Sequence, residues 1–146
     1  MTAHSYTAHA VATGDGRNGH VTSSDRLIDT DVRSPVELGG KGGATNPEQL
    51  FAAGYAACFH NALRRVARKA GADVTGSHVT ARVGIGFLNP NQFGLTAALD
   101  IALPAVARDL AEQVVEQAHQ VCPYSNATRG NMEVVLTVVD SVEVSA

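Results

Sequence analysis

The chain has 146 residues, of which 45% are hydrophobic and 17% charged, enough for one domain with a buried core. Its net charge is -3, it has no Trp, and only 5% of its residues are aromatic. These values argue against a nucleic-acid or anionic-membrane partner. No apolar run approaches the ~20 residues of a membrane span, and the first ten residues lack the basic and apolar segments of a signal peptide. We therefore expect a single cytoplasmic domain over residues 1–146.

The first third of the chain is predicted to hold two short strands, residues 6–13 and 21–31. The segment GDGRNG at residues 14–19 joins them, and its Asp-Gly and Asn-Gly pairs are typical of hairpin turns. A second glycine-rich segment, residues 38–47, is predicted to be a flexible connector.

A long helix is predicted next. Asn46 can cap it, Pro47 suits its first position, and Gln49 stands where a capping box places Glu or Gln. We expect the helix to run to Ala70 and to stop at Gly71. Residues 50–59 (LFAAGYAACF) are apolar or small on every face, which indicates burial on all sides. Because so short a chain can hardly surround a helix, we expect a homodimer.

The rest of the chain alternates between strand and helix patterns. Residues 79–87 and 93–103 have apolar side chains at every second position and flank a turn at residues 89–92. Residues 106–121 have helical spacing and precede Pro123, and residues 132–144 are predicted to form a last strand. The order of elements is not regularly alternating, so we predict an α+β fold with antiparallel sheets.

The two cysteines, Cys58 and Cys122, are the candidate reactive groups, although two buried and inert thiols are the ordinary alternative. Cys58 lies about eleven residues inside its helix, where the helix dipole no longer helps and burial raises the thiol pKa. Only about 3% of an ordinary thiol is ionised at neutral pH, so a nucleophilic Cys58 needs a nearby cation. A unit charge about 4 Å away contributes roughly 4 kcal/mol at an effective dielectric constant near 20. Arg17, in the glycine-rich turn, is the best candidate, with a solvated turn residue as the alternative.

Glu48 and the segment after Cys122 complete the candidate site. Glu48 precedes Cys58 by ten residues, about 15 Å along a helix, so we expect it to hold an arginine or to act in the partner's site. Cys122 is followed by Pro123 and by turn-forming polar residues, so its thiol is expected to be able to move, as a resolving cysteine must. His60 and His119 stand near the cysteines, but Cys58 and His60 point about 200° apart on a helix, so no metal site is expected.

Two segments resemble the signature segments of the organic hydroperoxide resistance proteins, within the OsmC-like superfamily. They are TNPEQLFAAGYAACFHNAL at residues 45–63 and AHQVCPYSNATRGN at residues 118–131. The resemblance extends over the whole chain. It implies an OsmC-like α+β fold with a long central helix, an intertwined homodimer with two sites at the subunit interface, and a thiol peroxidase that needs no metal or other cofactor.

The resemblance also implies roles for four residues. Cys58 resembles the peroxidatic cysteine and Cys122 the resolving cysteine. Arg17 resembles the arginine that activates the thiol and the hydroperoxide, and Glu48 the carboxylate that holds this arginine. The implied reductant is dihydrolipoamide, usually on lipoylated proteins. His60 and Asn61 depart from the apolar or small residues that members often carry there, which bears on substrate preference.

The implied reaction takes organic hydroperoxides, of fatty-acid or alkyl type, to alcohols through a Cys58 sulfenic acid and a Cys58–Cys122 disulfide. An apolar pocket would favour organic substrates over hydrogen peroxide. Phe87, Leu88 and Phe93 are candidates to line it, with core or dimer packing as the alternative. Two other functions stay open: a non-catalytic module that binds an apolar ligand, and a metal-binding sensor.

Overall fold

The structure is a computed structural model that describes residues 5–140. It divides into two compact units, residues 1–50 and 51–146, and each is described by itself. The single domain over residues 1–146 stays a prediction. Within the described part of the chain, no helix is both long and apolar enough to cross a membrane.

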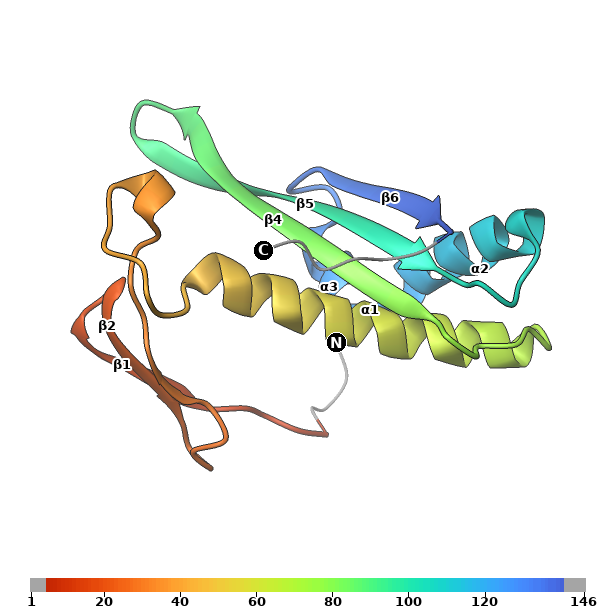
Figure 1. Cartoon of the computed structure of the whole chain (residues 1–146), viewed down its shortest axis with the longest axis horizontal. Helices are drawn as coiled ribbons and strands as arrows, with labels where there is room; N and C mark the ends of the chain where they lie inside the picture. Colours follow the sequence, from red (N-terminus) through yellow and green to blue (C-terminus); the bar gives the residue numbers. More distant parts are fainter. Residues whose placement is uncertain (1–4, 141–146) are drawn as a thin grey trace. The chain divides into compact units, whose positions relative to one another are not determined.

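The first unit holds a three-stranded antiparallel sheet in the order β1-β2-β3, formed by β1 (Ala10–Asp15), β2 (Asn18–Ser23) and β3 (Asp29–Asp31) (Figure 1). The predicted hairpin is confirmed, although its first strand begins four residues later and ends two residues later than expected. Asp15 pairs with Asn18, so Gly16 and Arg17 form a two-residue loop. Gly16 has a φ of 62°, as the first loop position of a type II′ turn requires. This turn places Arg17 at the tip of the hairpin.

The predicted strand over residues 21–31 is wrong in one respect, because a turn divides it into β2 and β3. The Asp25 carboxylate accepts hydrogen bonds from the Leu27 N–H at 3.0 Å and from the Ser23 hydroxyl at 2.7 Å. Arg26 adopts a φ of 62°, and the Ser23 N–H donates to the Ile28 carbonyl at 2.8 Å. An aspartate that binds the backbone two residues ahead favours a turn over a continuous strand.

The glycine-rich connector contains more hydrogen bonds than the prediction of flexibility implies. It follows a short 3-10 helix, η1 (Val36–Leu38). The Gly40 N–H donates to Pro35 and the Gly42 N–H to Ser34, both at 3.0 Å. Near its end, Thr45 forms a parallel bridge with Val32.

The long helix α1 (Pro47–Lys69) begins and ends as predicted, within one residue. The Asn46 side chain accepts a hydrogen bond from the Gln49 N–H at 2.9 Å, which confirms the N-cap. The Gln49 side chain accepts from the Thr45 hydroxyl instead of completing the capping box. At the other end, the Ala72 N–H donates to Ala67 at 2.8 Å and the Gly71 N–H to Arg68 at 3.1 Å. This pair of bonds is a Schellman motif.

The second unit holds a sheet in the order β4-β5-β6, formed by β4 (His78–Asn89), β5 (Gln92–Ala102) and β6 (Val134–Val139). The predicted hairpin is confirmed, with Phe87 opposite Phe93 beside the turn. The expectation of purely antiparallel sheets is wrong for β6, which runs parallel to β5. The chain crosses between them through two helices, and such a crossover returns a strand in its original direction. The predicted last strand ends at Val139, and its residues 141–144 lie outside the described part of the chain.

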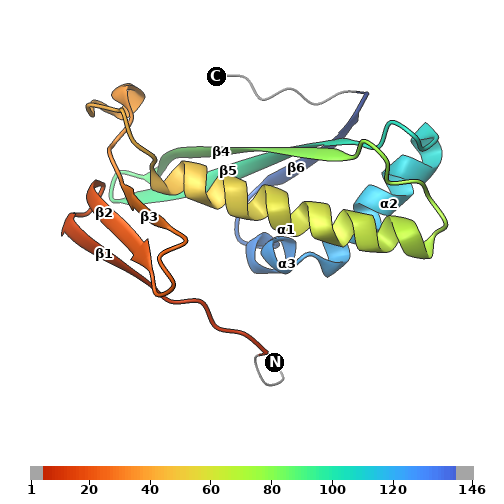
Figure 2. The same cartoon turned by 60° about the horizontal axis from the view of Figure 1, so that its bottom comes forward.

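These two helices are α2 (Arg108–Val121) and α3 (Pro123–Thr128). The break at Pro123 is confirmed, but the polar segment after it is a short helix and not an open turn, because Pro123 occupies its first position. Figure 2 shows α1, α2 and α3 on the same face of the β4-β5-β6 sheet. The core lies between them, and its largest fully buried side chains are Tyr55, Phe59, Leu63, Leu99, Ile101 and Val114. The predicted α+β class is confirmed.

Candidate functional site

The structure brings the two cysteines together in the second unit. Cys58 lies in the middle of α1 and is half-buried, whereas Cys122 is fully buried. Both thiols are free. The Cys58 thiol interacts with the Cys122 side chain and with the backbone N–H of Tyr124. The fold therefore makes neighbours of two thiols that are far apart in the sequence.

Cys122 occupies the junction of α2 and α3. Its N–H donates to the Ala118 carbonyl at the end of α2, and its carbonyl accepts from the Asn126 N–H in α3, both at 2.9 Å. Pro123 cannot continue α2, so the chain turns here and the Cys122 side chain points into the core. The expected movement of this thiol stays a prediction.

The surroundings of Cys58 in this unit favour the protonated thiol. Burial is the largest effect and raises the Cys58 pKa, and the neighbouring Cys122 raises it further. The Tyr124 N–H lowers the pKa but does not reverse the shift. The predicted direction of the burial effect is confirmed, and a nucleophilic Cys58 needs a cation.

Tyr124 packs against α1 one turn before Cys58. A Cβ atom at Gly54 would lie 2.5 Å from the Tyr124 hydroxyl oxygen, so only glycine leaves room for this ring. The ring also contacts Phe51 and Tyr55, with centroids 5.8 and 5.5 Å away. The contact between Gly54 and Tyr124 was not predicted, and the spacing of four residues between Gly54 and Cys58 was the only local signal for it.

A buried hydrogen-bond network holds α3 against α1 and α2. The Ser125 hydroxyl lies 2.8 Å from the Tyr55 hydroxyl and 2.8 Å from Nδ1 of His119. The Tyr55 hydroxyl also lies 3.4 Å from that of Thr128. Burial, and then the Arg129 charge, lower the His119 pKa. The network therefore fixes α3, and the Tyr124 N–H near the start of α3 interacts with the Cys58 thiol.

The two histidines of the weighed metal site have hydrogen-bond partners. His119 contacts Ser125, as above, and Nε2 of His60 lies 2.9 Å from the Ser77 hydroxyl. Among residues 5–140 there is no cluster of three or more His, Cys, Asp or Glu side chains that could hold a metal ion.

Arg17 and Glu48 form a two-pronged ion pair in the first unit. Nη1 of Arg17 donates to Oε2 of Glu48 at 2.9 Å, and Nη2 donates to Oε1 at 2.6 Å. Glu48 is 12% exposed and Arg17 39%. The hydrogen bonds from Arg17 lower the Glu48 pKa, and the same contact raises the Arg17 pKa, so both are charged at neutral pH. The structure therefore brings together the turn arginine and the carboxylate expected to hold one.

A cavity of about 430 Å³ opens beside Cys58 in the second unit. Its lining comes from α1 and from the α2–α3 junction: Asn61, Ala62, Arg65, Val66, Lys69, Val121 and Pro123. The predicted pocket residues Phe87, Leu88 and Phe93 are not among them. They lie at the tip of the β4–β5 hairpin with 72%, 72% and 65% of their surfaces exposed, which excludes core packing within one chain. Their role in binding substrate stays a prediction.

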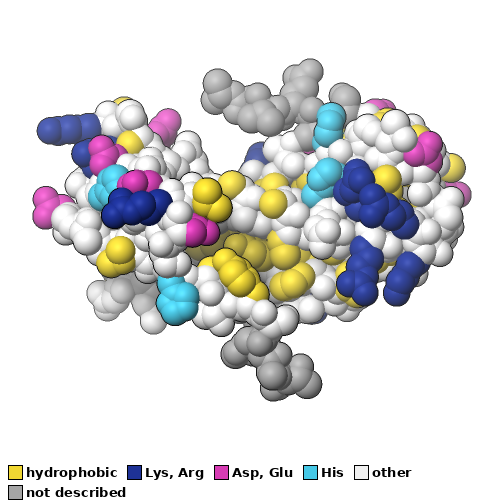
Figure 3. Space-filling model, turned by 90° about the horizontal axis from the view of Figure 1, so that it is seen from below, with side chains coloured by type: hydrophobic (Ala, Val, Ile, Leu, Met, Phe, Trp, Pro, Cys, Tyr) yellow, Lys and Arg dark blue, Asp and Glu magenta, His cyan; other side chains and the backbone are white. Residues whose placement is uncertain are grey.

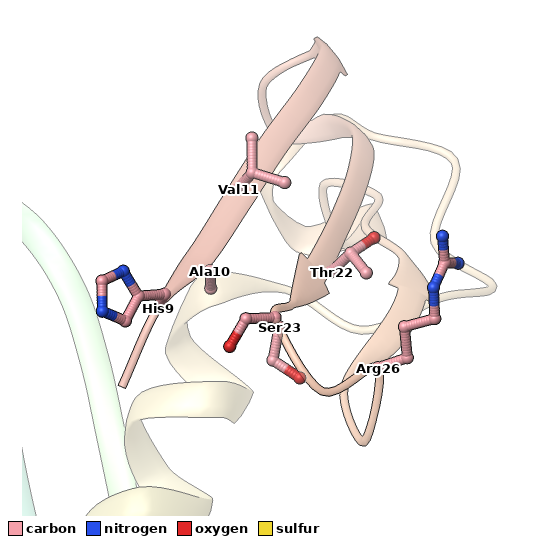
Figure 4. A pocket seen from close by; sticks show the side chains of 7 residues that line it. His9, Ala10, Val11, Thr22, Ser23 and Arg26 are labelled. Carbon is pink, nitrogen blue, oxygen red and sulfur yellow. The ribbon is translucent and has the colours of Figure 1, made fainter. Parts of the chain in front are cut away.

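The first unit has a smaller hollow of about 260 Å³ on β1 and β2 (Figure 4). Its only charged or titratable side chains are His9 and Arg26, which lie on opposite sides of the view in Figure 4. The hollow is lined by no thiol and by no pair of acid and base groups, so it lacks the reactive side chains that the cavity beside Cys58 has.

Comparison with known proteins gives one consistent family. The family model described as OsmC-like protein matches residues 40–137, which include both cysteines. The organic hydroperoxide resistance protein of Xanthomonas axonopodis pv. citri (strain 306) is 52% identical over 135 residues, 91% of this chain and 94% of that protein. Organic hydroperoxide resistance protein OhrA of Bacillus subtilis (strain 168) is 45% identical over 138 residues, 92% of this chain and 96% of that protein.

A solved structure supports the same family. The crystal structure of an organic hydroperoxide resistance protein from Legionella pneumophila has a TM-score of 0.88 and 48% identity, and the match covers 93% of this chain and 98% of that one. The chain therefore belongs to the OsmC-like family and, within it, to the organic hydroperoxide resistance proteins.

Proposed function

We propose that this protein is a thiol peroxidase that reduces organic hydroperoxides to alcohols and thereby confers resistance to them. The observation that carries the proposal is the contact between two free thiols, Cys58 and Cys122, in a chain so similar to organic hydroperoxide resistance proteins.

In the proposed reaction, the Cys58 thiolate attacks the distal oxygen of the hydroperoxide. The O–O bond breaks, the alcohol leaves with a proton, and Cys58 becomes a sulfenic acid. The Cys122 sulfur then attacks the Cys58 sulfur, water leaves, and a disulfide forms. A dithiol reductant supplies two electrons and two protons to restore both thiols by exchange.

We assign Arg17 the role of the activating cation and Glu48 the role of its holder. The buried surroundings of Cys58 raise its pKa, so the reaction requires a positive charge that reverses this shift. A bidentate carboxylate fixes the plane of a guanidinium, and Glu48 makes this contact with Arg17. The rest of the assignment is supported by the resemblance of the glycine-arginine turn.

The proposed partners follow the family. The reductant is dihydrolipoamide or a lipoylated protein, and the cytoplasm is the proposed location because its reducing conditions keep both thiols free.

The proposed assembly is a homodimer. It is supported by Ala53 and Ala57, which are exposed on α1 within one chain although the surrounding helix segment is apolar.

The proposed substrates have an apolar body. Phe87, Leu88 and Phe93 are proposed to contact it, since exposed apolar side chains bind apolar groups or partner surfaces. The ring centroids of Phe87 and Phe93 are 4.7 Å apart, so the two rings form one continuous apolar surface.

Stopped-flow mixing of the reduced protein with cumene hydroperoxide tests the function. We expect the parent to consume the hydroperoxide with loss of two thiols, Cys58→Ser to consume none, and Cys122→Ser to consume about one equivalent and then over-oxidise. Binding of cumene hydroperoxide without thiol loss would contradict the proposal and favour a ligand-binding module.

A further inference from the structure

A second arginine, Arg33, contacts the hairpin that carries Arg17. Arg33 lies just after β3, and its Nη1 donates to the Gly19 carbonyl at 2.9 Å and to the Val32 carbonyl at 2.6 Å. Gly19 is the second residue after Arg17 in the hairpin. Arg33 therefore holds the backbone beside the turn, whereas Glu48 holds the Arg17 guanidinium itself.

The segment from residue 32 to 34 is in contact with the hairpin along its whole length. The Val32 N–H donates to the same Gly19 carbonyl at 3.0 Å, and the Ser34 N–H donates to the Asn18 side chain at 3.4 Å. Gly19 itself has no room for a side chain, because a Cβ atom there would lie 2.1 Å from the Thr13 carbonyl oxygen. The backbone bond from Val32 does not need the Arg33 side chain, so we expect the hairpin to form without it.

Arg33 belongs to a charged cluster on the surface of the first unit. Its Nη2 lies 3.6 Å from the Asp31 carboxylate, which also contacts Nδ1 of His20 at 2.8 Å. Figure 3 shows cationic, acidic and His side chains close together in this unit, at the left of the view. Arg26 pairs with Asp29 at 3.6 Å in a similar way, but it is 78% exposed and its side chain forms no hydrogen bond with the described residues. Arg33 is 33% exposed, and of these two arginines it is the one that holds the hairpin.

The activating effect proposed for Arg17 depends on where its charge lies. Arg17 is at the tip of a two-residue loop, and its side chain is 39% exposed. At an effective dielectric constant near 20, moving a unit charge from about 4 Å to about 6 Å from a thiol changes the equilibrium between thiol and thiolate roughly tenfold. A contact that fixes the turn therefore has a measurable effect on the reaction.

We propose that Arg33 is a positioning residue for the peroxidase reaction, which acts through Arg17 by holding the turn in the place from which Arg17 activates the Cys58 thiol. The inference rests on the proposed function and on the role assigned there to Arg17. Arg33 therefore affects the rate only while Arg17 is present.

The test is a double-mutant cycle on Arg33 and Arg17, measured as the rate at which cumene hydroperoxide oxidises Cys58 in a single turnover. Arg33→Met keeps the stem of the side chain and removes its donors. We expect it to slow the oxidation roughly three- to tenfold at neutral pH and to move the alkylation profile of Cys58 to higher pH by up to about one unit. In the Arg17→Ala background the same substitution should change the rate by less than about twofold, because the residue through which it acts is gone.

Two further variants separate positioning from a general loss of structure or charge. Arg33→Lys keeps the charge and one donor group, so it should recover part of the rate. The matched control, Arg26→Met, removes an arginine that pairs with an aspartate of the same strand, and it should keep the parent's rate and profile. A thermal transition measured on each variant shows that it is folded. If Arg33→Met does not fold, the cycle is measured with Arg33→Lys, for which a smaller loss is expected.

The possible failures are distinguishable. If the parent does not oxidise Cys58 with cumene hydroperoxide, the proposed function itself fails. If Arg17→Ala keeps the parent's rate and profile, the role assigned to Arg17 fails, and this inference fails with it. If Arg17→Ala slows the reaction but the Arg33 variant does not, the inference is overturned alone. An Arg33 variant that slows the reaction equally in the Arg17→Ala background, or an equal loss in Arg26→Met, also overturns it.

Discussion

The Tyr124 ring occupies the space where residue 54 would carry a side chain. A Cβ atom at Gly54 would lie 2.5 Å from the Tyr124 hydroxyl oxygen and 3.0 Å from the ring carbon that bears it. Because the Tyr124 N–H contacts the Cys58 thiol, the packing of this ring is coupled to the surroundings of the proposed nucleophile.

The substitution Gly54→Ala is therefore expected to displace Tyr124 and to slow Cys58 oxidation several-fold. Alanine also stabilises a helix by about 1 kcal/mol relative to glycine, so a loss of activity without a loss of stability would separate positioning from unfolding. Adding Tyr124→Phe to Gly54→Ala removes the hydroxyl oxygen that lies closest to the new Cβ atom, and it should recover part of the Cys58 oxidation rate.

The control for this prediction is Gly86→Ala, where a new Cβ would meet no atom within 4 Å. Stopped-flow thiol oxidation and thermal denaturation are measured on all four proteins. An unchanged rate in Gly54→Ala would refute the positioning role.

The Arg17–Glu48 pair predicts how Cys58 reactivity depends on pH. Burial raises the Cys58 pKa. If Arg17 supplies the proposed activating charge, Arg17→Ala should move the alkylation profile of Cys58 to higher pH, by up to about three pK units. Arg17→Lys keeps the charge without the two-pronged contact and should give an intermediate profile. Glu48→Gln should shift it less than Arg17→Ala.

Iodoacetamide alkylation of Cys58 from pH 5 to 10 measures this shift, in a Cys122→Ser background that leaves one thiol. Lys41→Ala removes one exposed charge elsewhere and should match the parent. Profiles of Arg17→Ala and the parent that coincide at every pH would show that Arg17 does not activate the thiol.

The strongly patterned elements could be predicted from the sequence. Alternating apolar residues predicted the β4–β5 hairpin, and Asn46 and Gly71 predicted the two ends of α1. The parallel pairing of β6 could not be predicted, because alternation has the same period in parallel and antiparallel strands. The division of β2 from β3 depends on local hydrogen bonds of Asp25, which compete with a strand pattern.

The residue types of the candidate site could be predicted from the sequence, but its contacts could not be derived from the residues alone. The Arg17–Glu48 contact joins residues 31 positions apart, and it was expected only through the family resemblance. The Gly54–Tyr124 contact and the cavity beside Cys58 both join α1 to the α2–α3 junction. Residues so far apart in the chain have no periodic signal in one sequence.

The buried network around Ser125 predicts a loss of stability without a direct loss of chemistry. Ser125→Ala leaves the Tyr55 hydroxyl and the His119 ring with fewer partners, so the free energy of unfolding should fall by about 1–3 kcal/mol. Asn126→Ala, on the exposed side of α3, should change it by no more than about 0.5 kcal/mol. Urea denaturation of both variants provides the comparison, and equal stabilities would show that the network contributes little.

The apolar segment of α1 predicts an obligate homodimer. Light scattering at micromolar concentration should give a mass twice that of the 15.2 kDa chain. Ala57→Glu places a charge on the exposed side of this segment and should weaken the dimer, whereas Asn126→Glu should not. A monomeric mass for the parent would reject the dimer.

The central claim, a disulfide-forming peroxidase pair, is tested most directly by intact mass spectrometry of the reduced protein before and after one equivalent of cumene hydroperoxide. The account predicts a loss of about two hydrogens and a single linked peptide pair that contains Cys58 and Cys122. It also predicts that Cys122→Ser gains about one oxygen on Cys58 instead. An unchanged mass in the parent, or oxidation that leaves Cys58 unmodified, would contradict it.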